Sequence, residues 1–423
     1  MKRLILILTA GALMLSLASC AANSGKVFAQ LDLEAAPLLA IDWEKDYPEI
    51  STNDFALKLS AELAKSVDGE NFVCSPFSVW LPLAALVNGT DAAHKAALLD
   101  ALGAKGISEN DLNEYASLAL YALTNERMKE QDYGEYYNPL RIANAIFVDN
   151  DVTLKRDFAQ KFLDFYRGTG FNVDFESKDA VKEVNQWASD NTDGLITDII
   201  QEFDPRTVAA IANAIYFSDR WTWEFNAKNT RQDTFHAVGG DTTADFMLRE
   251  GDMQIYYEDD RVQAMPLSFL SGGFLCVILP KDGDATGLLQ SLSDDYFQEI
   301  QRDSISATGK LLLPKFEIDS GLLSLNDALQ TLGVPLFDQG AAPLTKGILE
   351  EDIPVWVDSA VQKAYIKVDE KGTTAAAVTV LAAPGSGMPE PTEPFEMKCD
   401  KPFVFVLTGR SGDVLFTGVV NRP

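Results

Sequence analysis

Histidine is scarce in this chain, which limits the acid–base chemistry it could perform. Only His94 and His236 are present. A Ser-His-Asp triad needs a histidine beside a nucleophile, but no GxSxG turn presents a serine, and the Gly-Ser-Gly at residues 385–387 lacks that spacing. The metalloprotease, dinucleotide-binding and P-loop motifs are also missing. The sequence therefore predicts no catalytic residue, no cofactor and a protein that is not an enzyme.

The cysteines do not form a metal-binding pattern. Cys74, Cys276 and Cys399 lie far apart in the sequence, and none belongs to a CxxC pair, so no metal site is expected. An odd number of thiols leaves at least one of them free. Whether two of the three form a disulfide stays open.

A mechanical role is indicated by a short segment near the C-terminus. Residues 363–368 alternate polar and apolar side chains, as a half-buried strand does. Glu370 follows, and Gly372 can supply a backbone bend that other residues resist. Within 373–379 no side chain is larger than valine, so this tract could enter a packed sheet without clashes. Residues 381–394, rich in Pro and Gly, predict an exposed loop.

Hydrophobic periodicity predicts the elements that would position this tract. Apolar residues at helical spacing predict the helices Asn53–Lys65, Pro82–Leu102, Asp157–Tyr166 and Asp179–Ser189. Alternating or continuous apolar runs predict the strands 141–148, 208–217, 273–279, 310–318, 402–407 and 414–420. Helices dominate the first half and strands the second, which predicts an α+β fold rather than alternating βαβ units.

The N-terminus has the pattern of a targeting signal. Two basic residues precede Leu4–Leu17, which is apolar but too short to be a comfortable permanent membrane span. The sequence Leu-Ala-Ser-Cys ending at Cys20 resembles a bacterial lipobox. That resemblance implies a lipoprotein signal peptide over residues 1–19 and a lipid on this cysteine. The alternative is an ordinary secretory signal that is cut near Ala22.

The lipobox also implies a location for the protein. Residues 20–45 would form a lipidated tether, and the lipid on Cys20 would be the contact with the membrane. Ala21 and Ala22 provide no acidic retention signal, which favours an outer-membrane anchor in a bacterial cell envelope. The protein is thus expected to be exported and to face either the periplasm or the cell surface.

Composition limits the partners and the number of domains. The 423 residues carry a net charge of -28 and are 47% hydrophobic. Such acidity argues against nucleic-acid binding, because phosphate recognition needs clustered Lys and Arg, and it favours solubility. The apolar content suffices for one large core or two ordinary domains. Because no long linker follows residue 45, we expect a single domain over 46–423.

A series of short motifs runs in order from residue 50 to the C-terminus. They are Asn71–Ser78, Arg141–Val148, Asn185 with Trp187, Thr192, Gly194 and Ile196, Asn213–Trp221, Leu313–Phe316, Leu332–Val334, Lys401–Phe405, Leu415–Gly418 and Pro423. Each motif alone is weak, but their order and spacing together resemble the serpins, a family of suicide protease inhibitors. The small-residue tract after Gly372 resembles the hinge of this family.

The resemblance implies an α+β serpin fold with three β-sheets, about nine helices and an exposed reactive-centre loop at about 370–394. It also implies a breach cluster at the place where strand insertion begins. In that cluster Glu370 is expected to pair with Lys315 and to lie near Trp221.

A shutter cluster of polar residues is implied beneath the sheet, where strands must part. Its expected members are Ser75, Ser78, Asn213 and Gln362. Buried polar groups suit this place, because they can satisfy the backbone in both states of the sheet. The family usually has a histidine at the position of Gln362. Glutamine can donate and accept hydrogen bonds but cannot titrate, which argues against pH-sensitive opening.

The resemblance further implies inhibition of serine endopeptidases, and also of cysteine endopeptidases, by a monomer. A protease would attack the loop, and the segment beginning at Thr373 would then insert as a new strand and trap the enzyme as a covalent complex. Strand insertion of this kind is an established example from the family. The hinge is expected to comprise Glu370, Gly372, Thr373, Ala375, Ala377 and Thr379. The side chains of its last four members are small, and they alternate along the segment so that all four would be buried beneath the sheet after insertion.

The position of the cleaved bond depends on how the loop is counted. Counting forward from Glu370 by the family's spacing places it at Ser386–Gly387. Counting backward from Lys401 places it near Pro391, because the loop is longer than usual. Met388 is a further candidate. We prefer the forward count, since the inserted length is what traps the protease.

The composition of the loop predicts a class of target. Residues 381–394 contain no Lys or Arg, so a trypsin-like protease would lack the cation that its acidic pocket needs. Elastase-like or subtilisin-like enzymes are therefore the expected targets. The main alternative is a non-inhibitory serpin that acts as a binding or chaperone-like protein.

Overall fold

The computed structural model describes residues 3–10, 28–30, 32–37, 47–67, 69–124, 140–192, 194, 196–204, 206–373 and 394–423. The chain forms two compact units. The first contains Met1–Leu59, Ser75–Phe217 and Gly321–Ala364, and the second contains Ser60–Cys74, Ser218–Ser320 and Tyr365–Pro423. Each unit is therefore assembled from segments far apart in the sequence. The single domain expected over 46–423 stays a prediction.

The first unit is built on a mixed β-sheet. Within the described residues this sheet has seven strands, in the order β13-β14-β1-β6-β4-β5-β2. Their bounds are Phe316–Ser324 (β13), Val357–Val368 (β14), Arg3–Ala10 (β1), Thr207–Phe217 (β6), Leu140–Asp149 (β4), Gly168–Val173 (β5) and Phe28–Gln30 (β2). The start of β13 and the end of β14 belong to the second unit. β6 is buried along its whole length, as is typical of a strand covered on both faces.

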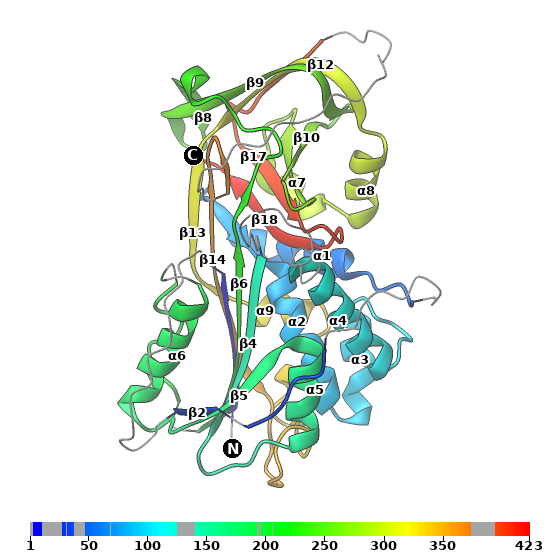
Figure 1. Ribbon diagram of the computed structural model, residues 1–423, viewed down its shortest axis with the longest axis vertical. Coiled ribbons are helices and arrows are strands. Elements are labelled where there is room, and N and C mark those ends of the chain that lie inside the picture. Colours follow the sequence, from blue (N-terminus) through cyan, green and yellow to red (C-terminus); the bar gives the residue numbers. More distant parts are fainter. Residues whose placement is uncertain are drawn as a thin grey trace. The chain divides into compact units, whose positions relative to one another are not determined.

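Helices cover both faces of this sheet (Figure 1). α6 (Lys178–Asn191) lies on one face, and α2 (Pro76–Leu86), α4 (Glu109–Thr124) and α5 (Arg156–Tyr166) lie on the other. The other helical elements of this unit are α3 (Ala92–Ala101), α9 (Asn326–Thr331), the 3-10 turn Pro335–Phe337 and most of α1 (Thr52–Ala64). The central strand β6 is therefore covered on both faces, whereas residues of β13 remain exposed.

The single helix predicted over Pro82–Leu102 is wrong. The structure has α2 and α3 there, separated by the 3-10 turn Val87–Gly89. Asp91 caps α3, because its side chain accepts hydrogen bonds from the N–H groups of Ala93 and His94. The break was hidden in the sequence because α2 is buried on every side, so its apolar residues show no helical period that ends at a boundary.

The second unit consists mainly of strands. Within its described residues a nine-stranded sheet has the order β16-β12-β9-β10-β11-β17-β18-β3, with β8 paired to β9. The bounds are Phe395–Lys398 (β16), Ile305–Pro314 (β12), Gly240–Glu258 (β9), Val262–Ser268 (β10), Phe274–Pro280 (β11), Phe403–Thr408 (β17), Val414–Val420 (β18), Phe72–Cys74 (β3) and Arg231–Ala237 (β8). A small sheet pairs β15 (Gly372–Thr373) with β7 (Asp219–Arg220). The helices are α7 (Ala285–Ser291), α8 (Asp294–Arg302) and the 3-10 turn Ala227–Asn229.

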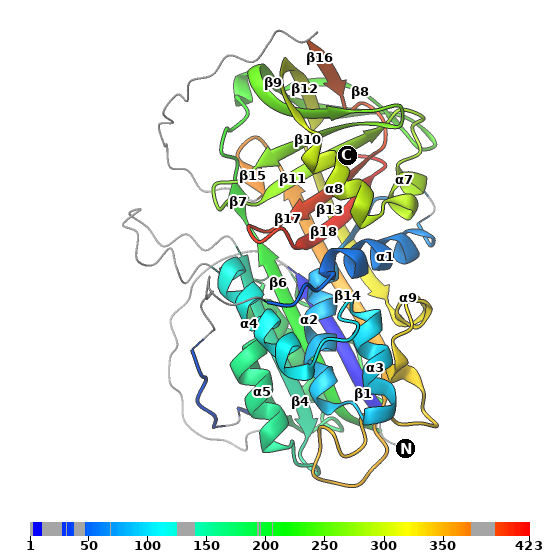
Figure 2. The same ribbon diagram turned by 90° about the vertical axis from the view of Figure 1, so that its right-hand side faces the viewer.

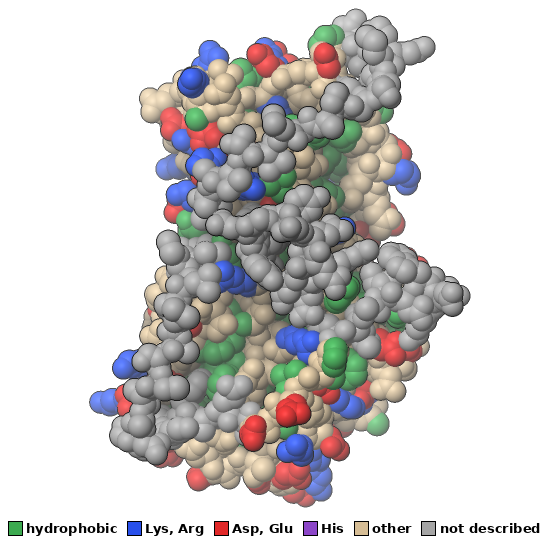
Figure 3. Space-filling model, in the orientation of Figure 1, with side chains coloured by type: hydrophobic (Ala, Val, Ile, Leu, Met, Phe, Trp, Pro, Cys, Tyr) green, Lys and Arg blue, Asp and Glu red, His purple; other side chains and the backbone are tan. Residues whose placement is uncertain are grey.

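The predicted fold class is confirmed. The described part of the chain contains nine α-helices and three β-sheets in a mixed α+β arrangement. None of the helices in that part is long and apolar enough to cross a membrane. On the face shown in Figure 3, acidic and basic side chains are interspersed.

The N-terminal segment contributes a strand to the first unit. β1 lies between β14 and β6 and pairs in parallel with both (Figure 2). It falls inside the predicted signal peptide, residues 1–19. The predicted lipidation site, Cys20, lies outside the described residues. The signal peptide, the tether over 20–45 and the export of the protein stay predictions.

The described cysteines are buried thiols. Cys74, Cys276 and Cys399 are all free, so no disulfide forms among the residues that the structure describes. Burial raises the pKa of Cys74 to about 11 and the pKa of Cys276 to about 12. These thiols therefore stay protonated near neutral pH and are poor nucleophiles.

Candidate functional site

The turn after β14 carries the residues expected to form the breach cluster. Lys315 Nζ lies 3.4 Å from Glu370 Oε1, which is the expected pairing. The Thr230 hydroxyl donates a hydrogen bond of 2.8 Å to the same carboxylate oxygen, and Asp245 Oδ2 lies 3.5 Å from the Lys315 ammonium. The Glu370 side chain is only 17% exposed, so its charge is held by a cation and a hydroxyl in a largely enclosed position.

These contacts set the charge of Glu370. Burial opposes its ionisation, but the hydrogen bond from Thr230 and the charge of Lys315 outweigh burial, so the pKa of the carboxyl lies below its usual value. A group whose pKa is lower in the folded chain stabilises the fold above its unfolded pKa, here about 4.3. That contribution is lost as the pH falls through the folded pKa.

We therefore expect Glu370→Gln to lower the free energy of unfolding by about 1 kcal/mol at pH 7, and to approach the wild type below about pH 4. Urea unfolding at a series of pH values measures this difference. Glu396→Gln is the matched control, because Glu396 pairs with Lys310 at 3.0 Å with both side chains largely exposed and should contribute little. A difference that is the same at every pH would contradict an ionic role for Glu370.

Trp221 anchors the backbone of the same turn. Its indole N–H donates to the Asp369 carbonyl at 2.9 Å, and its backbone N–H donates to the Lys371 carbonyl at 2.9 Å. The N–H of Phe225 donates to the Glu370 carbonyl at 2.8 Å. The Trp221 ring stacks on Phe269, with 4.6 Å between the ring centroids. Three consecutive carbonyls of the turn are thus bound by one short segment, so the turn has a defined geometry.

The first hinge residues form strand β15 against β7. Gly372 lies opposite Arg220 and has φ +152°, and a Cβ atom there would approach the Asp219 carbonyl oxygen to 2.0 Å. The bend expected at this glycine is therefore combined with a close approach of two backbones. Thr373 is 1% exposed, and its hydroxyl oxygen accepts a hydrogen bond of 3.1 Å from the Asp219 N–H. The start of the hinge is thus docked and buried.

Gly372→Ala is expected to destabilise this docking by about 2–3 kcal/mol, because backbone strain and a steric clash add together. Thermal unfolding measures the loss. Gly240→Ala is the matched control, since Gly240 also has positive φ, +134°, but has open space around the added Cβ. The control isolates the cost of the backbone conformation, about 1 kcal/mol. Equal losses in the two variants would show that the contact with Asp219 is unimportant.

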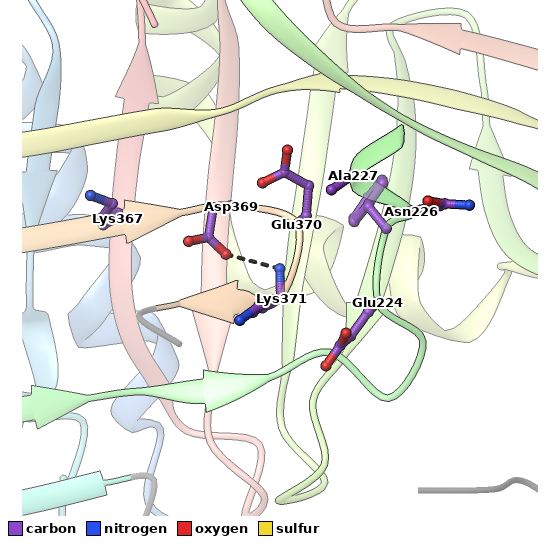
Figure 4. A pocket seen from close by; sticks show the side chains of 8 residues that line it. Glu224, Asn226, Ala227, Lys367, Asp369, Glu370 and Lys371 are labelled. Atoms are coloured by element: carbon purple, nitrogen blue, oxygen red, sulfur yellow. Dashed lines mark hydrogen bonds between the residues drawn. The ribbon is translucent and has the colours of Figure 1, made fainter. Parts of the chain in front are cut away.

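A pocket of about 630 Å³ lies beside the turn (Figure 4). Its lining comprises Lys367, Asp369, Glu370 and Lys371 from one segment and Glu224–Ala227 from another. Within it the N–H of Lys371 donates to Asp369 Oδ1 at 2.9 Å. This lining is mostly charged, whereas cofactor sites are mainly apolar with a few polar groups. The described residues also contain no cluster of His, Cys, Asp and Glu suited to a metal ion.

Three members of the shutter cluster bond directly to one another in the first unit. The Gln362 amide group donates to the Ser75 carbonyl at 2.8 Å and to Ser78 Oγ at 2.8 Å, and its oxygen accepts from the Ser75 N–H at 3.0 Å. All three residues are fully buried. One glutamine side chain therefore connects β14 to the start of α2 with three hydrogen bonds, none of which depends on a titrating group.

The fourth member of the cluster lies on the other side of β1. Asn213, on β6, donates from its amide group to Asn144 Oδ1 on β4 at 2.7 Å. Leu8 of β1 is in register with both Gln362 and Asn213. The structure thus places the four expected shutter residues in two groups, on strands that β1 separates.

The two histidines have local partners within the described residues. His94 Nδ1 lies 2.9 Å from Asp91 Oδ1, beside the cap of α3, and His236 Nδ1 lies 2.9 Å from Asp241 Oδ1 on the hairpin of β8 and β9. Both contacts are with a residue three to five positions away in the sequence. Neither arrangement resembles a catalytic triad.

Comparison with known proteins decides the family. A family model described as serpin (serine protease inhibitor) matches residues 50–423. The chain belongs to the serpin family. Members of this family are generally serine protease inhibitors rather than enzymes.

Similar proteins cover most of this serpin. An uncharacterized serpin-like protein of Thermococcus kodakarensis is 29% identical over 88% of this chain and 84% of its own length. Alpha-1-antitrypsin 1-3 of Mus musculus is 30% identical over 89% of each chain. Among solved structures, the thermophilic serpin tengpin in its native state is 26% identical, with a TM-score of 0.74 over 90% of this chain and 96% of its own.

Another similar structure shares the fold alone. Thyroxine-binding globulin in complex with thyroxine has a TM-score of 0.72 and 22% identity, and it covers 88% of this chain and 97% of its own. The serpin fold therefore also occurs in a protein that binds a small molecule.

Part of the predicted site lies outside the described residues. It comprises Ala375, Ala377, Thr379, Ser386, Gly387, Met388 and Pro391. The cleaved bond and the inserted phase of the reactive-centre loop stay predictions. The described hinge residues Glu370, Gly372 and Thr373 lie together in the second unit with Trp221 and Lys315.

Three residues at these sites are not among those expected from the sequence. Asp219 contacts Thr373, Thr230 bonds Glu370, and Asn144 bonds Asn213. Asn144 could have been noticed, because it is the one polar residue within the apolar run Ala143–Val148. Asp219 and Thr230 lie among other polar residues, so their sequence context does not distinguish them.

Proposed function

We propose that this serpin is a suicide-type inhibitor of serine endopeptidases, with cysteine endopeptidases as a second candidate class of target. The nucleophile of a protease would attack the reactive-centre loop and become acylated by the loop residue at the cleaved bond. The loop segment from Thr373 would then insert into the main sheet, the seven-stranded sheet of the first unit, before this acyl-enzyme is hydrolysed. The observation that supports this most directly is the spacing of β14 and β6. In this structure a complete strand fits between them and forms a ladder with each.

The energetics of such an insertion are sufficient to drive it. β1 has eight residues in register with β6 and six with β14. A loop strand of similar length would add on the order of ten hydrogen bonds, each worth roughly 0.5–1.5 kcal/mol net. The sum, about 5–15 kcal/mol, is comparable to the stability of a whole domain. Insertion of the loop can therefore hold a bound protease in a distorted state.

The hinge sequence supports insertion by this chain in particular. Thr373 lies five residues after Val368, the end of β14, so a loop that folds back there would run alongside β14. The alternate residues of the segment, Thr373, Ala375, Ala377 and Thr379, are all small. Large or charged side chains at these positions would have to be buried in the sheet, at a cost of several kcal/mol. The absence of Lys and Arg from 381–394 favours elastase-like or subtilisin-like targets.

Incubation with a panel of proteases tests this function. The chain beginning at Cys20 is mixed with elastase-like, subtilisin-like, papain-like and trypsin-like enzymes and analysed by SDS gel electrophoresis. We expect a complex that survives SDS with the elastase-like or subtilisin-like enzymes, and none with the trypsin-like one. If the loop is cut by several of these enzymes and no complex forms with any of them, the protein is a non-inhibitory serpin.

A further inference from the structure

Strand β1, which lies within the predicted signal peptide of residues 1–19 (the leader), occupies a central position in the main sheet, the seven-stranded sheet of the first unit. Along β6, β1 pairs from Arg3 opposite Thr207 to Ala10 opposite Ile215. Along β14, it pairs from Leu4 opposite Val357 to Thr9 opposite Lys363. Both pairings are parallel (Figure 2). α2 also contacts this strand. The leader therefore has hydrogen-bonding neighbours on both edges in the first unit.

The sequence of the leader suits this position. Residues 4–8 are Leu-Ile-Leu-Ile-Leu, a continuous aliphatic run. Strands that are buried on both faces, within parallel sheets, have sequences of this kind rather than an alternation of polar and apolar residues. An exposed edge strand would instead carry charged residues or proline. The same apolar run that predicts export is thus compatible with a central strand.

The amide N–H donors of Gln362 and Asn213, which flank the gap between β14 and β6, have partners while the leader is in place. Gln362 forms hydrogen bonds with Ser75 and Ser78 at the start of α2. Asn213 forms a hydrogen bond with Asn144 on β4. These two residues flank Leu8 on opposite sides. Since both amide groups find partners away from the gap, the leader can separate β14 from β6 without leaving a buried amide donor unmatched.

The direction of the leader distinguishes it from the reactive-centre loop. A loop that turns back after β14 would run antiparallel to β14, because it is joined to the end of that strand by residues 369–371. β1 runs parallel to β14. Two strands of opposite direction would therefore need the same backbone groups of β14 and β6, and only one of them can be bound at a time.

We infer that the gap between β14 and β6 is a binding site for β1 (Arg3–Ala10), which belongs to the chain's own leader, and that a chain which retains this leader is held with its main sheet filled. The inference rests on the proposed function for its consequence: the unprocessed chain cannot insert its loop, so it is a protease substrate rather than an inhibitor. Removal of residues 1–19 opens the gap. Inhibitory activity is thereby confined to the processed protein.

Proline substitutions in the full chain test the binding site itself. Residues 1–423 are made by cell-free synthesis so that the leader is retained, as wild type, as Ile7→Pro and as Met14→Pro. Ile7 lies opposite Val361 and Ala212, and proline there removes a ladder hydrogen bond and disfavours a central strand. Met14 belongs to the same leader but lies outside β1, so its variant controls for the loss of leader apolarity.

Hydrogen exchange reports the occupancy of the gap. We expect amides of β6 and β14 beside β1 to exchange about tenfold or more faster in Ile7→Pro than in the wild type, and Met14→Pro to match the wild type. The melting temperature should fall in Ile7→Pro alone. Equal exchange in all three proteins would overturn the inference, as would an equal increase in both proline variants.

A protease assay on the same proteins separates this inference from the proposed function. With both correct, the wild-type full chain is cleaved without forming a complex, and Ile7→Pro regains an SDS-stable complex. If exchange increases in Ile7→Pro but neither that variant nor the chain beginning at Cys20 forms a complex, the binding site stands and the proposed function fails. If the wild-type full chain forms the complex as efficiently as the chain beginning at Cys20, the leader does not block the gap and the inference is wrong.

Discussion

Cleavage of the leader-free chain within residues 381–394 is expected to raise its melting temperature by roughly 10–30 °C. In the uncut chain without its leader, β14 and β6 lack the strand that each pairs with in this structure. A cut loop can supply that strand from residue 373 onward. The new ladder would add on the order of ten hydrogen bonds, each worth roughly 0.5–1.5 kcal/mol net, and this gain appears as thermal stability.

Differential scanning calorimetry of the uncut and cut chain measures this shift. The cut is made with a catalytic amount of a protease that recognises the loop, and both fragments are kept together. Thr373→Arg, cut in the same way, is the matched control, since its loop should not insert from the first hinge residue. A melting temperature that stays the same after cleavage of the wild-type chain would favour a non-inhibitory binding protein.

Thr373→Arg is expected to convert the inhibitor into a substrate. Thr373 is 1% exposed and accepts a hydrogen bond from Asp219, and it begins the phase that would be buried on insertion. An arginine would carry an unpaired charge into that position, at a cost of several kcal/mol. Since 1.4 kcal/mol corresponds to a factor of ten in rate, the fraction of encounters that end in a complex should fall by more than about tenfold.

The partition between complex and cleaved chain measures this effect on a gel, with an elastase-like or subtilisin-like enzyme. Thr373→Ser is the matched control, because it keeps the hydroxyl that contacts Asp219 and removes only a methyl group. It should inhibit almost as well as the wild type. If Thr373→Arg forms as much complex as Thr373→Ser, insertion does not begin at this residue and the assignment of the hinge is incorrect.

Much of the fold follows from local patterns in the sequence. The strand predicted over 208–217 is observed as β6, and the helix predicted over Asp157–Tyr166 as α5, each within one residue. Their patterns are strong because each element is continuously apolar or has one apolar face. The break between α2 and α3 was missed because tertiary burial of α2 conceals its end. The role of β1 is also invisible locally, since a leader and a central strand can share the same aliphatic composition.

The site was predictable to the extent that motifs identify it. The pairing of Glu370 with Lys315 and the contact of Trp221 with the turn were expected from the resemblance to serpins, not from any local pattern. Thr230 and Asp219 were not expected, because single polar residues in loops and edge strands give no periodic signal. Their roles depend on a carboxylate and a backbone that approach from distant parts of the chain.

The central claim is that loop insertion traps a protease as an acyl-enzyme, and the intact mass of the complex tests it most directly. The leader-free chain is mixed with an elastase-like or subtilisin-like enzyme, and the intact mass of the denatured complex is measured by mass spectrometry. We expect a mass equal to the sum of the two proteins, less the C-terminal fragment released at Ser386–Gly387, with an ester bond joining the protease to the cleaved chain. A mixture that contains only free protease and cleaved chain would contradict it.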